Sequence, residues 1–241
     1  MEHHDRAVLV GVSSCLLGEQ VRYDGGHKRD AYVNDVLADH FTFVPVCPEV
    51  EVGMGVPRET VQLVDRGGDI RMIGHDSGKD HTAAMRRYAG RRVTALLEMG
   101  ISGYVLKARS PSCGMQQVPT HTEQGGEQGS GRGLFADALI TMSPSLPVEE
   151  EGRLDDPELR ESFIARVFAY SRLTRLFADG WTSSDLAAFH GAEESLLMAH
   201  DPEACEKLGR MVADAISGSR APLRHAYVKG FMTALEQGRD R

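Results

Sequence analysis

The sequence has only four cysteines, and no two of them stand close together. The Cys-x-x-Cys pairs of zinc fingers and zinc ribbons are therefore absent. The compact cysteine run of bacterial ferredoxins is absent as well. Any metal site in this chain must gather its ligands from distant parts of the sequence.

Long apolar runs are also absent. No stretch approaches the roughly 20 apolar residues that span a bilayer, and residues 1–6 have neither the basic start nor the apolar core of a signal peptide. We therefore expect a cytoplasmic protein with no membrane partner, whose cysteines are thiols or metal ligands rather than disulfides. The formal net charge of −8 argues against broad, unspecific attraction to nucleic acid and leaves room for a local basic patch.

The sequence does contain three apolar, strand-like runs that each lead into a short loop with one cysteine. The clearest is residues 103–106, which lead to the loop Ser110-Pro111-Ser112-Cys113-Gly114. Residues 8–12 and 43–46 lead in the same way to the next two cysteines. Open α/β sheets bind ligands at the carboxyl ends of their strands. We therefore predict that three side chains converge on one site: Cys15, Cys47 and Cys113.

Three thiolates at one site allow several kinds of chemistry. Soft sulfur ligands suit zinc, copper(I) and iron–sulfur clusters, and three protein ligands leave a fourth position open, as catalytic metal sites require. A non-catalytic iron–sulfur or zinc module, acting as a carrier or sensor, is a second interpretation, and a three-cysteine zinc hydrolase is a third. Cys205 lacks a comparable loop, and we expect it to be a buried thiol on a helix.

Polar residues near these loops are candidates for catalysis. Glu49 follows Cys47 by two residues and is a candidate general base, because a carboxylate beside a buried metal site can have a shifted pKa. A surface carboxylate is the ordinary alternative for this residue. The other candidates also have ordinary alternatives, in turns or on the surface. They are Asp24, Lys107, Ser110 and Ser112.

The order of patterns predicts two domains. Residues 1–145 alternate strand-like and helix-like segments, which is typical of an α/β fold with a parallel-type sheet flanked by helices. Residues 146–156 contain proline and acidic residues, and we expect a linker there. Residues 157–241 show helical patterns throughout and predict an all-helical accessory domain.

Several elements of the first domain can be placed. Helices are expected near residues 30–40, 80–99 and 134–140, and a short edge hairpin near residues 60–73. Residues 119–133 mix glycine with Gln and Glu and contain little to bury. No Gly-Lys-Ser/Thr phosphate-binding signature follows them, so we expect a flexible surface loop.

Five motifs of the first domain, in this order, resemble the thiouracil desulfurase family. They are Cys15-Leu16-Leu17-Gly18, Val21-Arg22-Tyr23-Asp24-Gly25, Val46-Cys47-Pro48-Glu49, Pro57-Arg58, and Leu106-Lys107 through Ser110-Pro111-Ser112-Cys113-Gly114. The resemblance implies an oxygen-sensitive 4Fe–4S cluster held by the three cysteines, with its fourth iron open to the substrate's sulfur. It also implies catalytic roles for Glu49 and for one serine of the Ser-Pro-Ser-Cys motif, of which we favour Ser110.

The helical part resembles the first part of a domain often fused to this one in tRNA 4-thiouridine desulfurases. Residues 186–190 and 196–200 carry the likeness, but Glu193 and Glu194 replace the usual His-Lys pair. The resemblance implies non-redox desulfuration of a thiolated pyrimidine, either free thiouracil or 4-thiouridine in tRNA, with release of hydrosulfide. A tRNA partner requires clustered positive charge. The candidates are Arg166, Arg172 and Arg175 on the first helix, and Arg220, Arg224 and Lys229 near the fourth.

Overall fold

The computed structural model describes residues 7–178, 180–214 and 220–237, so the N-terminal residues 1–6 discussed above lie outside it. The chain divides into two compact units. The sheet unit comprises residues 1–143 and 148–159, and the helical unit comprises residues 144–147 and 160–241. Among the described residues, no helix is long and apolar enough to cross a membrane. The cytoplasmic location stays a prediction.

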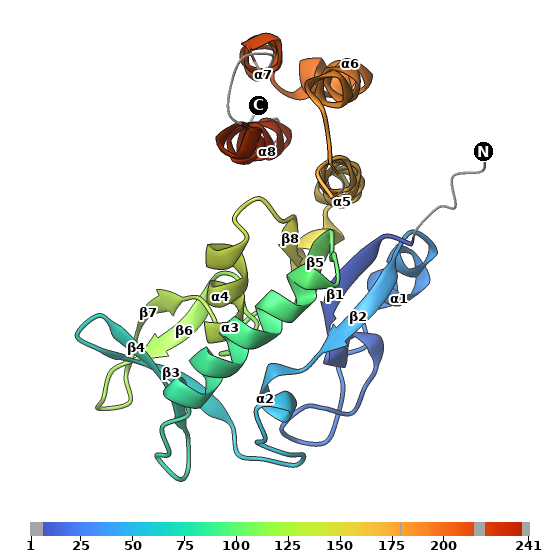
Figure 1. The fold of residues 1–241 in the computed structure, drawn as a ribbon. Helices are drawn as coiled ribbons and strands as arrows, with labels where there is room; N and C mark the ends of the chain where they lie inside the picture. The colour runs from blue at the N-terminus through green and yellow to red at the C-terminus, as the bar shows by residue number, and fades with distance from the viewer. Residues whose placement is uncertain (1–6, 179, 215–219, 238–241) are drawn as a thin grey trace. The chain divides into compact units, whose positions relative to one another are not determined.

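A parallel sheet of four strands forms the centre of the sheet unit (Figure 1). Its strand order is β2-β1-β5-β8, and all three neighbouring pairs are parallel. The strands are β1 Leu9–Ser13, β2 Thr42–Val46, β5 Gly103–Leu106 and β8 Val148–Glu150. The predicted parallel α/β fold is therefore confirmed, and the three predicted strands are β1, β2 and β5.

Two helices and an aromatic cluster form the core beside this sheet. The helices are α3 (Thr82–Glu98) and α4 (Leu134–Met142), close to the two predicted ranges. The Phe135 ring of α4 lies between Tyr88 of α3 and Tyr104 of β5, with centroid distances of 6.4 and 5.7 Å. A Cβ atom at Gly11 of β1 would lie only 2.2 Å from the Tyr104 ring. Position 11 must therefore be glycine for the Tyr104 ring to pack against this strand.

A second, mixed sheet has the strand order β4-β3-β6-β7. Its strands are β3 Val61–Arg66, β4 Asp69–Gly74, β6 Val118–His121 and β7 Glu127–Gly131. The predicted hairpin is β3–β4, and both of its turn glycines, Gly67 and Gly68, have positive φ. The flexible loop predicted for residues 119–133 is wrong, because most of it forms the β6–β7 hairpin. Val118 and Thr120 bury their side chains there, which the surrounding glycines hid in the sequence.

Residues 148–155, expected to lie in a linker, are ordered parts of the sheet unit. They form strand β8 and the 3-10 helix η3 (Glu151–Asp155). Their acidic side chains are partnered rather than solvated. Glu149 accepts a hydrogen bond from Arg153 Nε at 2.6 Å, and Glu150 accepts one from the Met115 amide at 2.6 Å. The partner of Glu149 is four residues away, whereas the partner of Glu150 is 35 residues away and could not be seen in the local sequence.

Short helical segments complete the sheet unit. The helix expected near residues 30–40 breaks at Val36 into α1 (Ala31–Asp35) and the 3-10 helix η2 (Leu37–Asp39). Two more segments follow the first two strands: the 3-10 helix η1 (Ser14–Leu17) after β1, and α2 (Pro48–Glu51) after β2. Both of these begin at the carboxyl end of a parallel strand and carry cysteine-loop residues.

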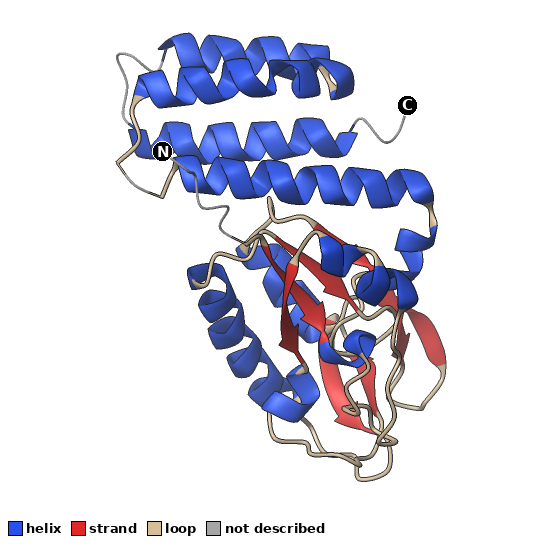
Figure 2. Ribbon diagram, turned by 90° about the vertical axis from the view of Figure 1, so that its right-hand side faces the viewer, coloured by secondary structure: helices blue, strands red, loops and turns tan. Residues whose placement is uncertain are grey.

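The C-terminal part is helical, as predicted, and Figure 2 shows its helices together with the strands of the sheet unit. The helices are α5 Pro157–Leu176, α6 Ser183–His200, α7 Pro202–Asp214 and α8 Arg220–Gln237. Thr182 and Asp185 form a reciprocal capping box at the start of α6. Cys205 of α7 is 4% exposed within the apolar core, consistent with its expected structural role.

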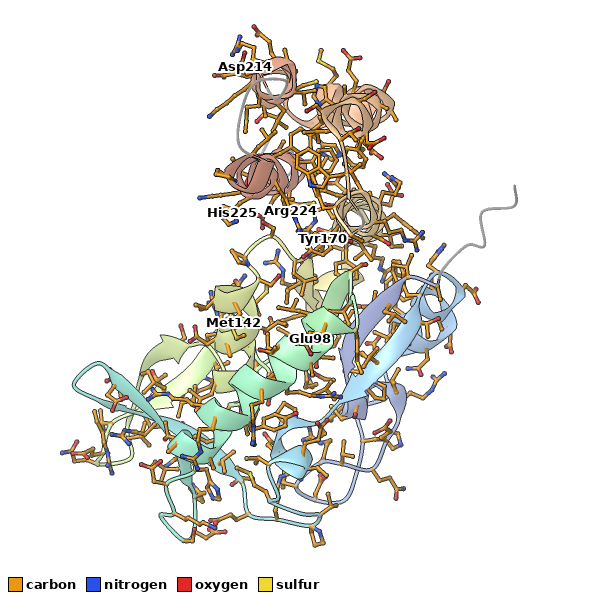
Figure 3. The ribbon with its side chains drawn as sticks, in the orientation of Figure 1. Glu98, Met142, Tyr170, Asp214, Arg224 and His225 are labelled. Atoms are coloured by element: carbon orange, nitrogen blue, oxygen red, sulfur yellow. The ribbon has the colours of Figure 1, made fainter. Side chains whose placement is uncertain are left out.

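The arginines expected to form a basic face on α5 have partners or are buried within the helical unit. Arg172 donates two hydrogen bonds to the buried Glu193 carboxylate, at 2.5 and 2.8 Å. Arg166 is only 5% exposed. On α8, Arg224 is labelled in Figure 3. Its guanidinium lies 5.4 Å from the centre of the Phe177 ring. The buried Glu193 carboxylate thus forms an ion pair with Arg172, whose side chain is 47% exposed.

Candidate active site

The three cysteines border a single cavity of about 360 Å³ in the sheet unit. Cys15 lies in η1 just after β1, Cys47 precedes α2 at the end of β2, and Cys113 lies in the turn after β5. Parallel strands end at the same edge, so residues far apart in sequence meet there. All three are free thiols; Cys15 and Cys113 are buried and Cys47 is half-buried.

The loop that carries Cys113 is held from several sides. Ser110 Oγ accepts hydrogen bonds from the backbone amides of Ser112 and Cys113, both at 3.2 Å. The second and third amides of α4, those of Phe135 and Ala136, donate to the Ser112 carbonyl at 2.9 and 3.1 Å. A Cβ atom at Gly133 would lie 2.5 Å from the Ser112 carbonyl carbon, so only glycine permits this contact. The helix start therefore fixes the thiol's position through the backbone.

Burial raises the pKa of these thiols and so favours their protonated form. Burial raises the pKa of the Cys15 thiol to about 11, against a smaller lowering by Lys107. Burial also raises the pKa of Cys113 well above its usual value, and the nearby Glu49 carboxylate adds to this effect. Only the thiolate binds metals strongly, so metal binding must displace these protons.

The donor set fits an iron–sulfur cluster. Three free thiols border one cavity, and thiolates are the ligands that such clusters take. Among the residues that the structure describes, no three Cys, His, Asp or Glu side chains are grouped so as to hold one metal ion. A cluster contains several irons, and its ligands bind different atoms, so the thiolates do not have to meet at one point.

Glu49 lies in the same cavity and is held through both of its carboxylate oxygens. Its Oε1 accepts a hydrogen bond from Ser112 Oγ at 2.8 Å. Its Oε2 forms an ion pair with the guanidinium of Arg58, whose side chain is only 6% exposed. The carboxylate therefore has a defined orientation within reach of a molecule bound in the cavity.

Comparison with known proteins assigns this arrangement to a family. A model of 2-thiouracil desulfurases matches residues 10–151, more than half of the chain. The chain belongs to the 2-thiouracil desulfurase family. The Bacillus subtilis (strain 168) protein YbbK is 32% identical over 153 residues, which are 61% of this chain and 99% of that protein. The solved structure of the 4Fe-4S-dependent thiouracil desulfidase TudS is 30% identical with a TM-score of 0.51, covering 64% of this chain and 98% of that one.

The family match includes the whole cavity and ends at Glu151, before α5. It confirms the resemblance seen in the five sequence motifs. It gives no information on α6, α7 and α8, which lie beyond the matched residues.

The other four predicted site residues of this desulfurase-family unit differ in their position relative to the cavity. Ser110 and Lys107 line the cavity, and the Lys107 ammonium forms an ion pair with Glu151. Ser112 is fully buried beside Glu49. Asp24 is about half exposed in a turn outside the cavity lining, where it accepts a hydrogen bond from the Gly26 amide at 3.0 Å. That hydrogen bond holds the pKa of Asp24 below its usual value. Asp24 thus occupies the turn position that the sequence analysis gave as the alternative to a catalytic role.

Two residues of the site were missed as functional candidates. Arg58 appeared only as part of a family motif, and Glu151 lay in the expected linker. Each acts on a residue more than eight positions away: Arg58 pairs with Glu49 nine residues earlier, and Glu151 with Lys107, 44 residues earlier. A local pattern cannot reveal such pairs. The only signal was the charge of Glu149, Glu150 and Glu151, which was taken as a mark of solvent exposure.

Proposed function

We propose that this protein is a 4Fe–4S-dependent desulfurase that converts a thiolated pyrimidine to its oxo form without net redox change. The observation that carries the proposal is the convergence of three thiols and one oriented carboxylate on the same cavity. In this proposal the cluster is held by Cys15, Cys47 and Cys113. The family membership supports the reaction, and the printed cofactor of TudS supports the cluster.

The roles of the chain's own residues follow from their places around the cavity. When bound, the cluster supplies a Lewis-acidic iron with an open position for the soft thiocarbonyl sulfur. Glu49 takes a proton from the water that attacks the thiolated carbon. The carbon–oxygen bond forms, the carbon–sulfur bond breaks, and sulfur leaves with its electron pair, taking the second proton of the water and so departing as hydrosulfide. Ser110 and Lys107 face the cavity and orient the ring by hydrogen bonding, whereas Ser112 holds Glu49.

The first test is anaerobic purification followed by metal analysis and an activity assay. We expect about four irons and about four acid-labile sulfides per chain, together with conversion of thiouracil to uracil and release of hydrosulfide. Stoichiometric zinc with hydrolytic activity would instead support a three-cysteine zinc hydrolase. A full cluster with no turnover of free thiouracil or 4-thiouridine would instead support the carrier or sensor interpretation.

The second test distinguishes free thiouracil from 4-thiouridine in tRNA as the substrate. Residues 151–241 contain 12 Lys and Arg against 15 Asp and Glu, a net charge of −3. If tRNA binding used three contacts between basic side chains and phosphates, raising the salt concentration from about 50 to about 200 mM would weaken that binding by about 20-fold. We expect that salt sensitivity for tRNA and little change for free thiouracil. Absence of reaction with tRNA would identify a small-molecule desulfurase in which the helical unit has another role.

A further inference from the structure

Arg58 occupies an unusual position for a charged side chain, because it is buried in the wall of the cavity. Its side chain is only 6% exposed. Its Nη2 forms the ion pair with Glu49, and its Nη1 donates hydrogen bonds to the carbonyls of Val21 and Gly55, both at 2.9 Å. Val21 lies 37 residues before Arg58 in the sequence, whereas Glu49 and Gly55 lie nine and three residues before it. The planar guanidinium donates to these acceptors from two separate nitrogens in fixed directions, a geometry that the single nitrogen of a lysine does not reproduce.

The contacts of Arg58 and Ser112 together define where the Glu49 carboxylate points. Arg58 donates to Oε2 and Ser112 donates to Oε1, so each oxygen has a fixed partner. Both donors lie in anchored segments. The Arg58 backbone amide donates to the Tyr23 carbonyl at 2.9 Å, and the Ser112 carbonyl is held by the start of α4. Rotation of the carboxylate away from the cavity would break at least one charge-assisted hydrogen bond.

Arg58 also connects the carboxylate to the segment that includes Val21 and Tyr23. The Val21 carbonyl that it binds lies 3.8 Å from the sulfur of Cys47. Tyr23, two residues later, lines the cavity with its ring 42% exposed. One side chain therefore sets the distance between Glu49 and the segment that includes Val21 and Tyr23.

We propose that Arg58 is a positioning residue for desulfuration, which acts by holding Glu49 toward the reacting carbon and not by contacting the substrate. This inference rests on the proposed function. It assigns a role to a buried cation whose charge would otherwise be costly to bury. Arg71 differs, since its side chain is 35% exposed, pairs with Asp69 and Asp80, and lies outside the cavity lining.

The experiment compares Arg58→Ala, Arg58→Lys and the matched control Arg71→Ala. We expect Arg58→Ala to keep its full iron and sulfide content and an unchanged KM, while kcat falls by roughly 10²-fold, because misplacing a reacting group by about 1 Å has that effect. Arg58→Lys should show an intermediate loss. Millimolar guanidinium should restore part of the kcat of Arg58→Ala, whereas sodium chloride at equal ionic strength should not. Arg71→Ala should behave like the wild type.

A double-mutant cycle with Glu49→Gln tests whether Arg58 acts through Glu49. The double variant should have a kcat within about threefold of Glu49→Gln alone, since effects of residues that act as a unit do not add. Multiplied losses, loss of the cluster without guanidinium rescue, or a near wild-type kcat for Arg58→Ala would overturn the proposal. The melting temperatures of the wild type, the two single variants and the double variant, all without iron, measure the coupling between Arg58 and Glu49 independently of turnover. Additive shifts in melting temperature would also overturn the proposal. Failure of the wild type to desulfurate thiouracil would instead count against the proposed function.

Discussion

Replacing Cys15, Cys47 or Cys113 singly with alanine is expected to abolish both the visible absorbance of the cluster and the desulfurase activity. Each thiol follows a different strand of one parallel sheet, and the remaining cysteine, Cys205, does not line the cavity, so no other thiol is available there. The two remaining thiolates would hold an incomplete cluster that is open to solvent. Anaerobic absorbance spectra, iron and sulfide content, and thiouracil turnover measure the effect.

Cys205→Ala is the matched control for this experiment. Cys205 is also a buried free thiol, but it lies in the core of the helical unit. We expect its removal to leave the cluster and kcat unchanged. A fully active cluster in any of the first three variants would rule out ligation by all three cysteines.

Glu49→Gln is expected to assemble the cluster normally and to lose turnover by roughly 10²-fold or more, as removal of a general base does. The amide has nearly the same size, and its oxygen can still accept a hydrogen bond from Ser112. It has no basic oxygen to take the proton of the attacking water. Single-turnover measurements with the loaded enzyme, alongside iron and sulfide analysis, separate this chemical defect from a loss of cluster.

Asp24, the other candidate for the general base, provides the control for this prediction. Asp24 lies in a turn outside the cavity lining, so Asp24→Asn should change kcat only slightly. If Glu49→Gln turned over near the wild-type rate, another group would have to activate the water. A large loss in Asp24→Asn with an intact cluster would transfer the role of base to Asp24.

Most of the strands and helices could be predicted from the sequence because the residue patterns that specify them are local. Apolar runs that end in turn residues predicted β1, β2 and β5. Helical patterns predicted α3 to α8, with cap residues for α3, α5, α6 and α7. The parallel arrangement then followed from the alternation of strands and helices. Since parallel strands end at one edge, the same reasoning brought together the three cysteines. The five family motifs added the expected cofactor and reaction.

The sequence by itself therefore determined the fold class and the cysteine-bearing loops, whereas only the tertiary structure decided how the polar residues pair. Glu49 and Ser112 are 63 residues apart and share a hydrogen bond, and Arg172 and Glu193 are 21 residues apart and form a bidentate pair. Composition alone made residues 119–133 and 146–156 look exposed, yet both contain buried side chains in strands. The physical reason is that a buried polar group needs a partner, and that partner is supplied by the fold, not by the neighbouring sequence.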